Sequence, residues 1–395
     1  MKNQFKMSMV AAAVIAAGST GVYAEEGVSS TVDVSFRYRI ETVDQESMVE
    51  DAQASTLRTR ATIKTKWNDK FDSVLEFDDV TEIGMDEFNA GQGNTPDRSQ
   101  YPVVADPEGT EVNQAFVRYN GDSTKVAYGR QRILIENQRF VGGVGWRQNE
   151  QTYDGLTVNT KFGEVNFNYA YVSNVNRIFG EDVDAGDHEH NTHLINADMK
   201  LGDGKLSGYY FAIENETAQG ASNDTFGVRY SGKAGTFAYT AELATQSAGS
   251  DNPNDYDASY YLLEGAYKPD GYSIGAGIEV LGGDSANGQG FTTSLATLHK
   301  FQGWADVFLG TPASGIEDMY LNGSVKLGEF NLKAVYHTFA TDEGGVDLGT
   351  EFDLALSRKI NKKTSMLIKY ASFDSDNELL YSSRDKMWFM LTYKL

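Results

Sequence analysis

Apolar and charged residues alternate along the chain, and this pattern limits the fold more than any other feature. The segment 32–41 alternates apolar side chains with polar ones that include Arg37 and Arg39, and the segment 57–67 repeats the pattern. Successive side chains of a β-strand point to opposite faces, so each segment predicts a strand with one apolar and one charged face. The charged face meets water, and the apolar face therefore meets either a second sheet or lipid.

Short turns recur between the alternating segments and favour lipid. Each turn carries Gly, Asn, Asp or Pro, the residues that hairpins need, and they lie at 68–69, 120–122, 163–164, 202–204, 232–235, 269–271, 328–329 and 361–363. Aromatic residues flank most of them, among them Trp67, Phe162 and Tyr267. Aromatics at one common level form the girdle of a transmembrane barrel at a lipid–water interface, whereas a soluble sandwich would place them in mid-strand.

Longer polar segments alternate with the turns. They lie at 81–110, 134–150, 173–190, 247–255, 282–316, 340–348 and 374–384. Short periplasmic turns and long extracellular loops are typical of outer-membrane proteins. We therefore predict an all-β fold for residues 25–395, a transmembrane antiparallel up-and-down β-barrel of about 18 strands. The segment Phe291–Leu309 is predicted to be either an extra hairpin or a loop folded into the lumen.

The first residues predict export. Lys2 and Lys6 precede a short apolar stretch, and small residues up to Ala24 form a cleavage site, so residues 1–24 read as a signal peptide cleaved after Ala24. The predicted location is the cell outer membrane, with its lipid and lipopolysaccharide as surroundings. The last strand, which alternates from Met387 to Leu395, is similar to the signal that barrel-assembly machinery recognises.

Composition excludes some partners. The net charge is −22, and loss of the two leader lysines takes it to −24, so we expect no nucleic acid as a partner. The chain has no cysteine, so an exported form owes its stability to something other than disulfides. A closed ladder in lipid would suffice, since its backbone hydrogen bonds are obligatory there.

Arginine is concentrated in the first part of the chain and gives the candidate site. Ten of the fourteen arginines lie between Arg37 and Arg147. A guanidinium stays charged and offers a planar fork to carboxylates and phosphates. We predict that nine of them line a pore and contact anions: Arg37, Arg39, Arg58, Arg60, Arg118, Arg130, Arg132, Arg139 and Arg147. Alternatively they pair with acids such as Asp72, Glu76 and Asp78 and fill the lumen.

Three runs carry a family resemblance. They are DPEGTEVNQAFVRY (106–119), GRQRILIENQRFVGGVGWRQNEQTYDG (129–155) and LHKFQGWADVFLGTPASGIEDMY (298–320). These runs resemble the alginate-export-domain family of bacterial outer-membrane proteins. The resemblance implies an 18-stranded barrel with an arginine-lined lumen that passes an anionic polysaccharide. Its most specific run contains Arg130, Arg132, Arg139 and Arg147.

Other site chemistries are weaker. His188, His190 and His193 follow several acids but are read as a solvated loop, with His193 on the next strand, so we expect no metal site and no cofactor. A Ser-His-Asp set around His299, with Asp306 or Asp318 and Ser314, lacks the Gly-x-Ser-x-Gly motif, so we expect no enzyme and no catalytic residue.

The expected function is therefore a pore for passive passage of small hydrophilic, anionic solutes or oligosaccharides. Export of an anionic polysaccharide such as alginate is the alternative. A barrel adhesin and a barrel hydrolase are minor alternatives.

Overall fold

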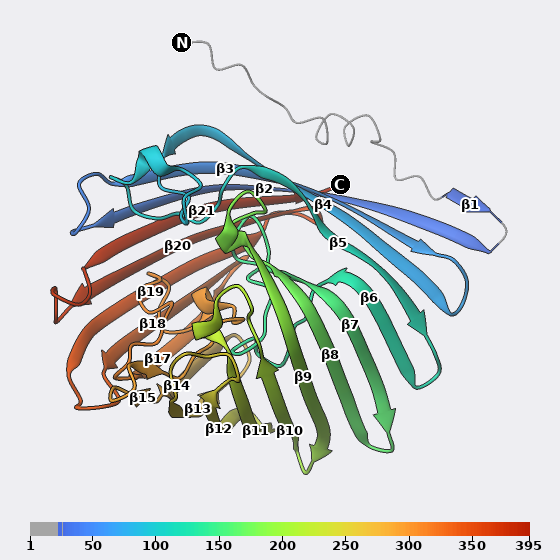
Figure 1. Ribbon diagram of the computed structural model, residues 1–395. Coiled ribbons are helices and arrows are strands. Elements are labelled where there is room, and N and C mark those ends of the chain that lie inside the picture. Colours follow the sequence, from blue (N-terminus) through green and yellow to red (C-terminus); the bar gives the residue numbers. More distant parts are fainter. Residues whose placement is uncertain (1–22, 26) are drawn as a thin grey trace.

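Antiparallel strands close into one barrel in the computed structural model, which describes residues 23–25 and 27–395 (Figure 1). Eighteen strands of these residues form the wall: β2 (Val28–Gln45), β3 (Ala52–Lys66), β4 (Phe71–Glu87), β5 (Gly109–Asn120), β6 (Thr124–Gln131), β7 (Thr152–Phe162), β8 (Val165–Asn176), β9 (Asp187–Leu201), β10 (Gly204–Ile213), β11 (Asn223–Ala234), β12 (Phe237–Ala248), β13 (Asp257–Tyr267), β14 (Tyr272–Leu281), β17 (Ile316–Leu327), β18 (Phe330–Ala340), β19 (Asp347–Lys359), β20 (Thr364–Ser375) and β21 (Arg384–Lys394). β21 pairs with β2 from Ser35↔Lys394 to Gln45↔Arg384, which closes the ring. The predicted fold class and strand number are confirmed.

The remaining elements are short. β1 (Tyr23–Glu25) pairs with the start of β2, and β15 (Gly283–Asp284) pairs with β16 (Gln289–Gly290). The 3-10 helices are η1 (Pro96–Arg98), η2 (Asp184–Gly186), η3 (Gln219–Ala221) and η4 (Leu298–Lys300). Among the residues described, no helix has the length and apolar character needed to cross a membrane. The predicted signal peptide lies almost wholly outside the described residues, so its cleavage stays a prediction.

The eight turns predicted from the sequence all connect consecutive strands at one end of the barrel. Two of them show why glycine stands there. Gly163 has a φ of +59° and Gly328 a φ of +60°, backbone conformations that only glycine adopts without strain. They allow the two-residue connections between Phe162 and Val165 and between Leu327 and Phe330, which are directly paired. The predicted long loops join the strands at the other end.

The two faces of the wall differ as the alternation requires. Leu243, Leu263 and Leu321 are at least 60% exposed on the outer face, where lipid would cover them. Arg37 and Arg39 are 7% and 1% exposed, because they point into the lumen and contact loop residues there. Trp67 and Phe162, beside the turns, are exposed on the outside at the level expected for a girdle.

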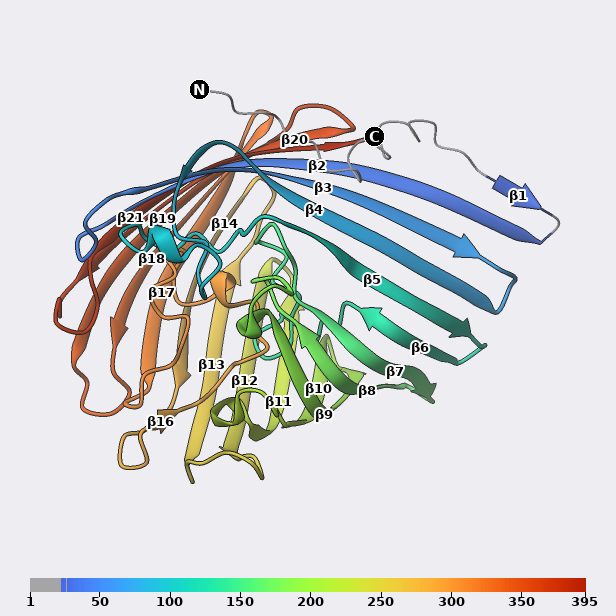
Figure 2. The same cartoon turned by 45° about the horizontal axis from the view of Figure 1, so that its top comes forward.

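One short strand shapes the interior. β6 has 8 residues, while its neighbours β5 and β7 have 12 and 11. Figure 2 shows β6 as a short arrow between two longer ones. After Gln131 the chain leaves the wall and enters the lumen as residues 132–151, which we call the β6–β7 loop. The early end of β6 therefore lets the β6–β7 loop enter the lumen and narrow it.

The lipid-facing assignment predicts a large effect of charge at mid-strand. Leu243→Arg places a cation in the apolar band and should lower the free energy of unfolding by about 2–4 kcal/mol. Thr240→Arg, on the same strand but lining a lumen cavity, should cost much less. Urea unfolding of the two proteins in lipid bilayers measures the difference, and equal losses would show that our assignment of faces is wrong.

Candidate functional site

Two loops meet inside the barrel. The β6–β7 loop contacts residues 282–315, which we call the β14–β17 loop. The amide of Gly142 donates to the carbonyl of Leu295 at 2.8 Å, and the amide of Thr297 donates to the carbonyl of Gln138 at 3.0 Å. The sequence left open whether 291–309 forms a hairpin, and the structure shows a loop folded into the lumen.

The junction holds a strained residue. Val144 has a φ of +47°, which is unfavourable for a β-branched side chain. Val144 lies outside the strands, and its backbone amide donates a hydrogen bond to the hydroxyl of Thr297 at 3.1 Å. Strain of this kind persists only where surrounding contacts hold the backbone, and it is common at functional sites. The contacts between the two loops thus fix the backbone conformation at their junction.

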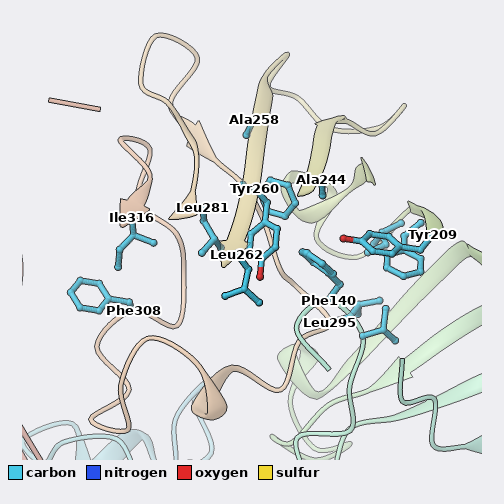
Figure 3. Close-up of a cluster of buried hydrophobic side chains, with 14 of the residues drawn as sticks. Phe140, Tyr209, Ala244, Ala258, Tyr260, Leu262, Leu281, Leu295, Phe308 and Ile316 are labelled. Atoms are coloured by element: carbon cyan, nitrogen blue, oxygen red, sulfur yellow. The ribbon is translucent and has the colours of Figure 1, made fainter. Parts of the chain in front are cut away.

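Aromatic packing anchors the loops to one side of the wall. Phe140 of the β6–β7 loop contacts Tyr260 with ring centroids 5.1 Å apart, and Phe308 of the β14–β17 loop contacts Phe339 at 4.7 Å. Figure 3 shows Phe140 between Tyr209 and Tyr260. The early strands suggested a uniformly charged inner face. On these later strands the inner face is partly apolar, because loops rather than water cover it.

Ion pairs and hydrogen bonds anchor the β6–β7 loop to β2. The Arg39 guanidinium pairs with Asp106 at 2.9 Å and lies 4.4 Å from the Trp146 ring. Arg37 donates to the side chain of Gln148 at 2.8 Å and to the carbonyl of Gly145 at 2.9 Å. Both arginines are therefore committed to holding loop residues.

A second cluster anchors the end of the same loop. Glu150 pairs with Arg60 at 2.7 Å and with Arg132 at 2.5 Å, and Arg58 lies 3.7 Å away. Burial disfavours the ionised carboxylate, but the charges of Arg60, Arg132 and Arg58 outweigh it and lower the pKa of Glu150 to about 2. Arg132 also reaches Glu76 at 2.5 Å. Glu150 is thus a shared anion for three of the predicted arginines.

Charged residues also join the two loops to opposite walls. Arg139 pairs with Glu279 of β14 at 2.8 Å. Arg147 bridges Glu41 of β2 at 2.9 Å and Asp306 of the β14–β17 loop at 3.0 Å. Lys386 of β21 reaches the same Asp306 at 2.9 Å. Burial of Asp306 disfavours its charge, yet its partners lower its pKa well below the ordinary range.

The two remaining predicted arginines lie nearer the turns and loops of the wall. Arg118 pairs with Asp72 at 2.9 Å, and Arg130 pairs with Asp154 at 2.9 Å and Glu181 at 2.7 Å. All nine predicted arginines therefore contact an acid or a loop group. Eight of them pair with an acid, as the sequence left open, and Arg37 instead holds Gln148 and loop carbonyls. Contact of these arginines with a passing anion stays a prediction.

His299 has both ring nitrogens occupied. Its Nδ1 lies 2.7 Å from Asp306, and its Nε2 lies 2.8 Å from the amine of Lys369. Burial lowers the pKa of His299 well below its usual value, against the opposing attraction of Asp306. Asp318 instead lies 2.8 Å from His337. Lys369, rather than a serine, thus completes the group around His299.

The three clustered histidines separate. His188, His190 and His193 all lie on β9, so His193 is on a strand as expected, whereas the reading of His188 and His190 as part of a solvated loop is wrong. His188 and His190 are buried on the lumen side, while His193 has the opposite phase and contacts Tyr169 at 2.8 Å. Within the described residues no group of three His, Cys, Asp or Glu is placed to hold a metal ion.

Cavities lie on both sides of the β6–β7 loop. The larger, of about 800 Å³, opens toward the long loops, and its charged lining consists of Arg147, Arg177, Arg384, Lys386 and the single carboxylate Asp306. The smaller, of about 520 Å³, lies toward the turns and is lined by Arg118, Lys125, Arg132, Lys205, Glu136 and Asp198. Cations outnumber carboxylates in both.

The cavity linings include residues that the sequence reading missed. Of the nine predicted arginines, Arg118, Arg132 and Arg147 line these cavities. Arg384 and Lys386 share the phase of Trp388 on the last strand, so the alternation could have identified them. Arg177 follows β8 in a loop, and no sequence pattern marks its inward position.

This geometry defines the class of protein: a transmembrane-type β-barrel whose lumen is narrowed by loops ion-paired to its wall. A family model described as alginate export matches residues 29–279. The match spans more than half of the sequence, and the chain belongs to the alginate export family.

Solved structures share the fold. OccK11 (OpdR) of Pseudomonas aeruginosa superposes with a TM-score of 0.69 at 14% identity, covering 93% of this chain and 96% of that one. OccAB4 of Acinetobacter baumannii gives 0.70 at 13%, covering 94% and 98%. OpdK of P. aeruginosa with vanillate gives 0.72 at 10%, covering 93% and 98%. At such identities the likeness concerns the fold alone. No curated protein matches the sequence.

Removing the shared anion should loosen the β6–β7 loop. Glu150→Gln keeps the size of the side chain but leaves Arg60, Arg132 and Arg58 without their common partner, at a cost of about 3 kcal/mol. Hydrogen exchange of residues 132–151 should become faster. Glu164→Gln, in an exposed turn without an ion pair, is the matched control, and equal protection in both variants would contradict the anchoring role.

Acid should release the loop only at low pH. A carboxyl whose folded pKa is depressed contributes stability that is complete above its unfolded pKa, about 4.3 for glutamate, and that is lost as pH falls through the folded value. For Glu150 that value is about 2. The loop should therefore stay protected from exchange at pH 5 and lose protection between about pH 4 and 2. Loss already at pH 5 would contradict the assignment.

Proposed function

We propose that the chain is an outer-membrane pore for passive passage of small hydrophilic anionic solutes. The observation that carries the proposal is the lining of the two cavities beside the β6–β7 loop. Four cations face one carboxylate in the larger cavity and two carboxylates in the smaller one, in a chain whose net charge is −22. Because charges beyond about 8 Å are screened at physiological salt, a local lining outweighs more distant acids.

Two arginines of the larger cavity are the strongest candidates for contact with a solute. Within the described residues, Arg177 and Arg384 have no carboxylate within ion-pair distance. The predicted arginines, by contrast, already hold acids or loop carbonyls. A passing carboxylate or phosphate would find free donors on Arg177 and Arg384. The anion preference thus rests mainly on residues outside the predicted set.

The in-folded loops limit the size of the solute that can pass, which favours small solutes. The β6–β7 and β14–β17 loops meet across the lumen through backbone hydrogen bonds and are anchored to β2, β14 and β21. A barrel of 18 strands without such loops would leave a wide aqueous space. The solved OpdK structure contains vanillate, an aromatic carboxylate, and vanillate is therefore a suitable first solute for this chain.

Export of an anionic polysaccharide is the second candidate. The family model that matches the chain is described as alginate export. The same cation-lined cavities suit a polymer of carboxylated sugars, provided that the two loops move apart. Protection of residues 132–151 from hydrogen exchange, measured with and without an oligosaccharide of uronic acids, distinguishes the candidates, because only the polymer requires the loops to separate.

Planar-bilayer recording tests the anion preference. Under a KCl gradient the reversal potential should show a preference for chloride over potassium. Arg177→Gln combined with Arg384→Gln should reduce this preference by about two- to fivefold, most clearly at low salt. Arg98→Gln, on a loop arginine that does not line the cavity, is the control. A cation-selective wild type would overturn the anion preference, and absence of conductance would overturn the pore.

A further inference from the structure

Lysine is distributed unevenly along the barrel axis. Of the eighteen lysines in residues 27–395, twelve stand near the strand ends that the tight turns join. The other six lie in the turns or inside the lumen: Lys70, Lys362, Lys363, Lys300, Lys369 and Lys386. Cationic side chains therefore gather at the end of the barrel that faces the periplasm in the expected orientation.

Lumen cavities place half of the twelve on the inner face. Cavities of about 520, 280 and 450 Å³ are lined, in that order, by Lys125 with Lys205, Lys268 with Lys333, and Lys64 with Lys66. The residues next to them along the strands point outward instead. Tyr267, which precedes Lys268, is 44% exposed on the outer face. The alternation thus separates an outer aromatic girdle from inner lysines.

Strand register places the other half on the same face, because residues directly opposite on antiparallel strands share a face. The pairs are Lys161↔Asn166, Lys200↔Lys205, Lys233↔Ala238, Lys326↔Asn331, Lys359↔Ser365 and Lys394↔Ser35. Each partner has the phase of the lumen. We call these twelve residues the inner lysine rim.

Most of the inner lysine rim lacks a negative partner. Lys64, Lys66 and Lys205 pair with acids at 3.0, 2.8 and 2.7 Å. In the part of the chain that the structure covers, the other nine make no ion pair. Lys200 stands directly opposite Lys205, and the carboxylate that compensates this like-charge pair, Glu136, is bound to Lys205. Carboxylates such as Asp72, Asp198 and Glu264 line the same cavities, but the lysines outnumber them, so the rim is a surface with an excess of cations.

The other end of the barrel has the opposite charge. The loops at 46–51, 177–186, 341–346 and 376–383 carry ten acidic residues, one arginine and no lysine. An anion approaching from that side meets acids first. The turns also carry six acids, but the twelve rim lysines with Lys70, Lys362 and Lys363 outnumber them and leave an excess of cations at that end. The barrel is thus electrically polarised along its axis.

We infer that the inner lysine rim is a binding site for small multivalent anions, and that it admits them to the pore from the turn side more readily than from the loop side. The inference rests on the proposed pore function. Exposed single ion pairs are weak, but an anion with several charges contacts several lysines at once. Coulomb attraction also grows with the charge of the ion. The rim therefore favours oligophosphates and polycarboxylates over chloride.

Sided block of single channels tests the inference, with inorganic tripolyphosphate as the probe. A single Lys362→Cys substitution, unique in a chain without cysteine, reports orientation through an impermeant thiol reagent. Tripolyphosphate added on the turn side should block KCl current at a concentration about tenfold lower than on the loop side. The asymmetry should shrink as salt is raised.

A matched pair of triple variants locates the site. Lys161→Gln, Lys200→Gln and Lys233→Gln together remove three unpaired rim charges and should raise the blocking concentration about tenfold on the turn side. Lys70→Gln, Lys362→Gln and Lys363→Gln remove three charges from the turns and should leave it nearly unchanged. Equal block by tripolyphosphate from both sides, or equal block of the two triple variants, would show that the inner lysine rim is not the binding site. Absence of KCl conductance would overturn the pore itself.

Discussion

An apolar bilayer offers no hydrogen-bonding partner, so every backbone N–H and C=O group that enters it must be paired within the protein. The pairing of β21 with β2 meets this requirement for the whole wall. Closure leaves no free edge, and this is why the described prolines lie in loops and turns. It also creates an inner surface that lipid cannot reach, and the remaining features of the molecule are arrangements of that surface.

The inner surface is covered by two kinds of chemistry. On β2 and β3, arginines hold loop carbonyls and acids such as Asp106 and Glu150. Across the lumen, aromatic side chains such as Tyr260 pack against Phe140. Directional ion pairs fix the position of the loops, whereas apolar contacts supply area that is removed from water. The loops are therefore anchored parts of the site, held by both kinds of contact.

The fold was readable from the sequence, and the site only in part. Alternation and turn residues are properties of neighbouring residues in the chain, so the turns and the strand number could be predicted from the sequence. Alternation also placed Arg37 and Arg39 on the inner face. The partners of these arginines are more than 60 residues away, and local patterns carry no such information. Arg177 was missed for that reason, and the inward Tyr209 was missed because its cover is a distant loop.

Three of the four tryptophans of the chain gather around one amine. The Nζ atom of Lys369 lies 4.2 Å from the ring centroid of Trp146, 3.8 Å from that of Trp304 and 5.2 Å from that of Trp388. Trp146 and Trp304 come from the two in-folded loops and Trp388 from the wall. Indole emission depends on its surroundings, and only Trp67 lies elsewhere. The tryptophan emission of this protein therefore reports whether the two in-folded loops are in contact with the wall.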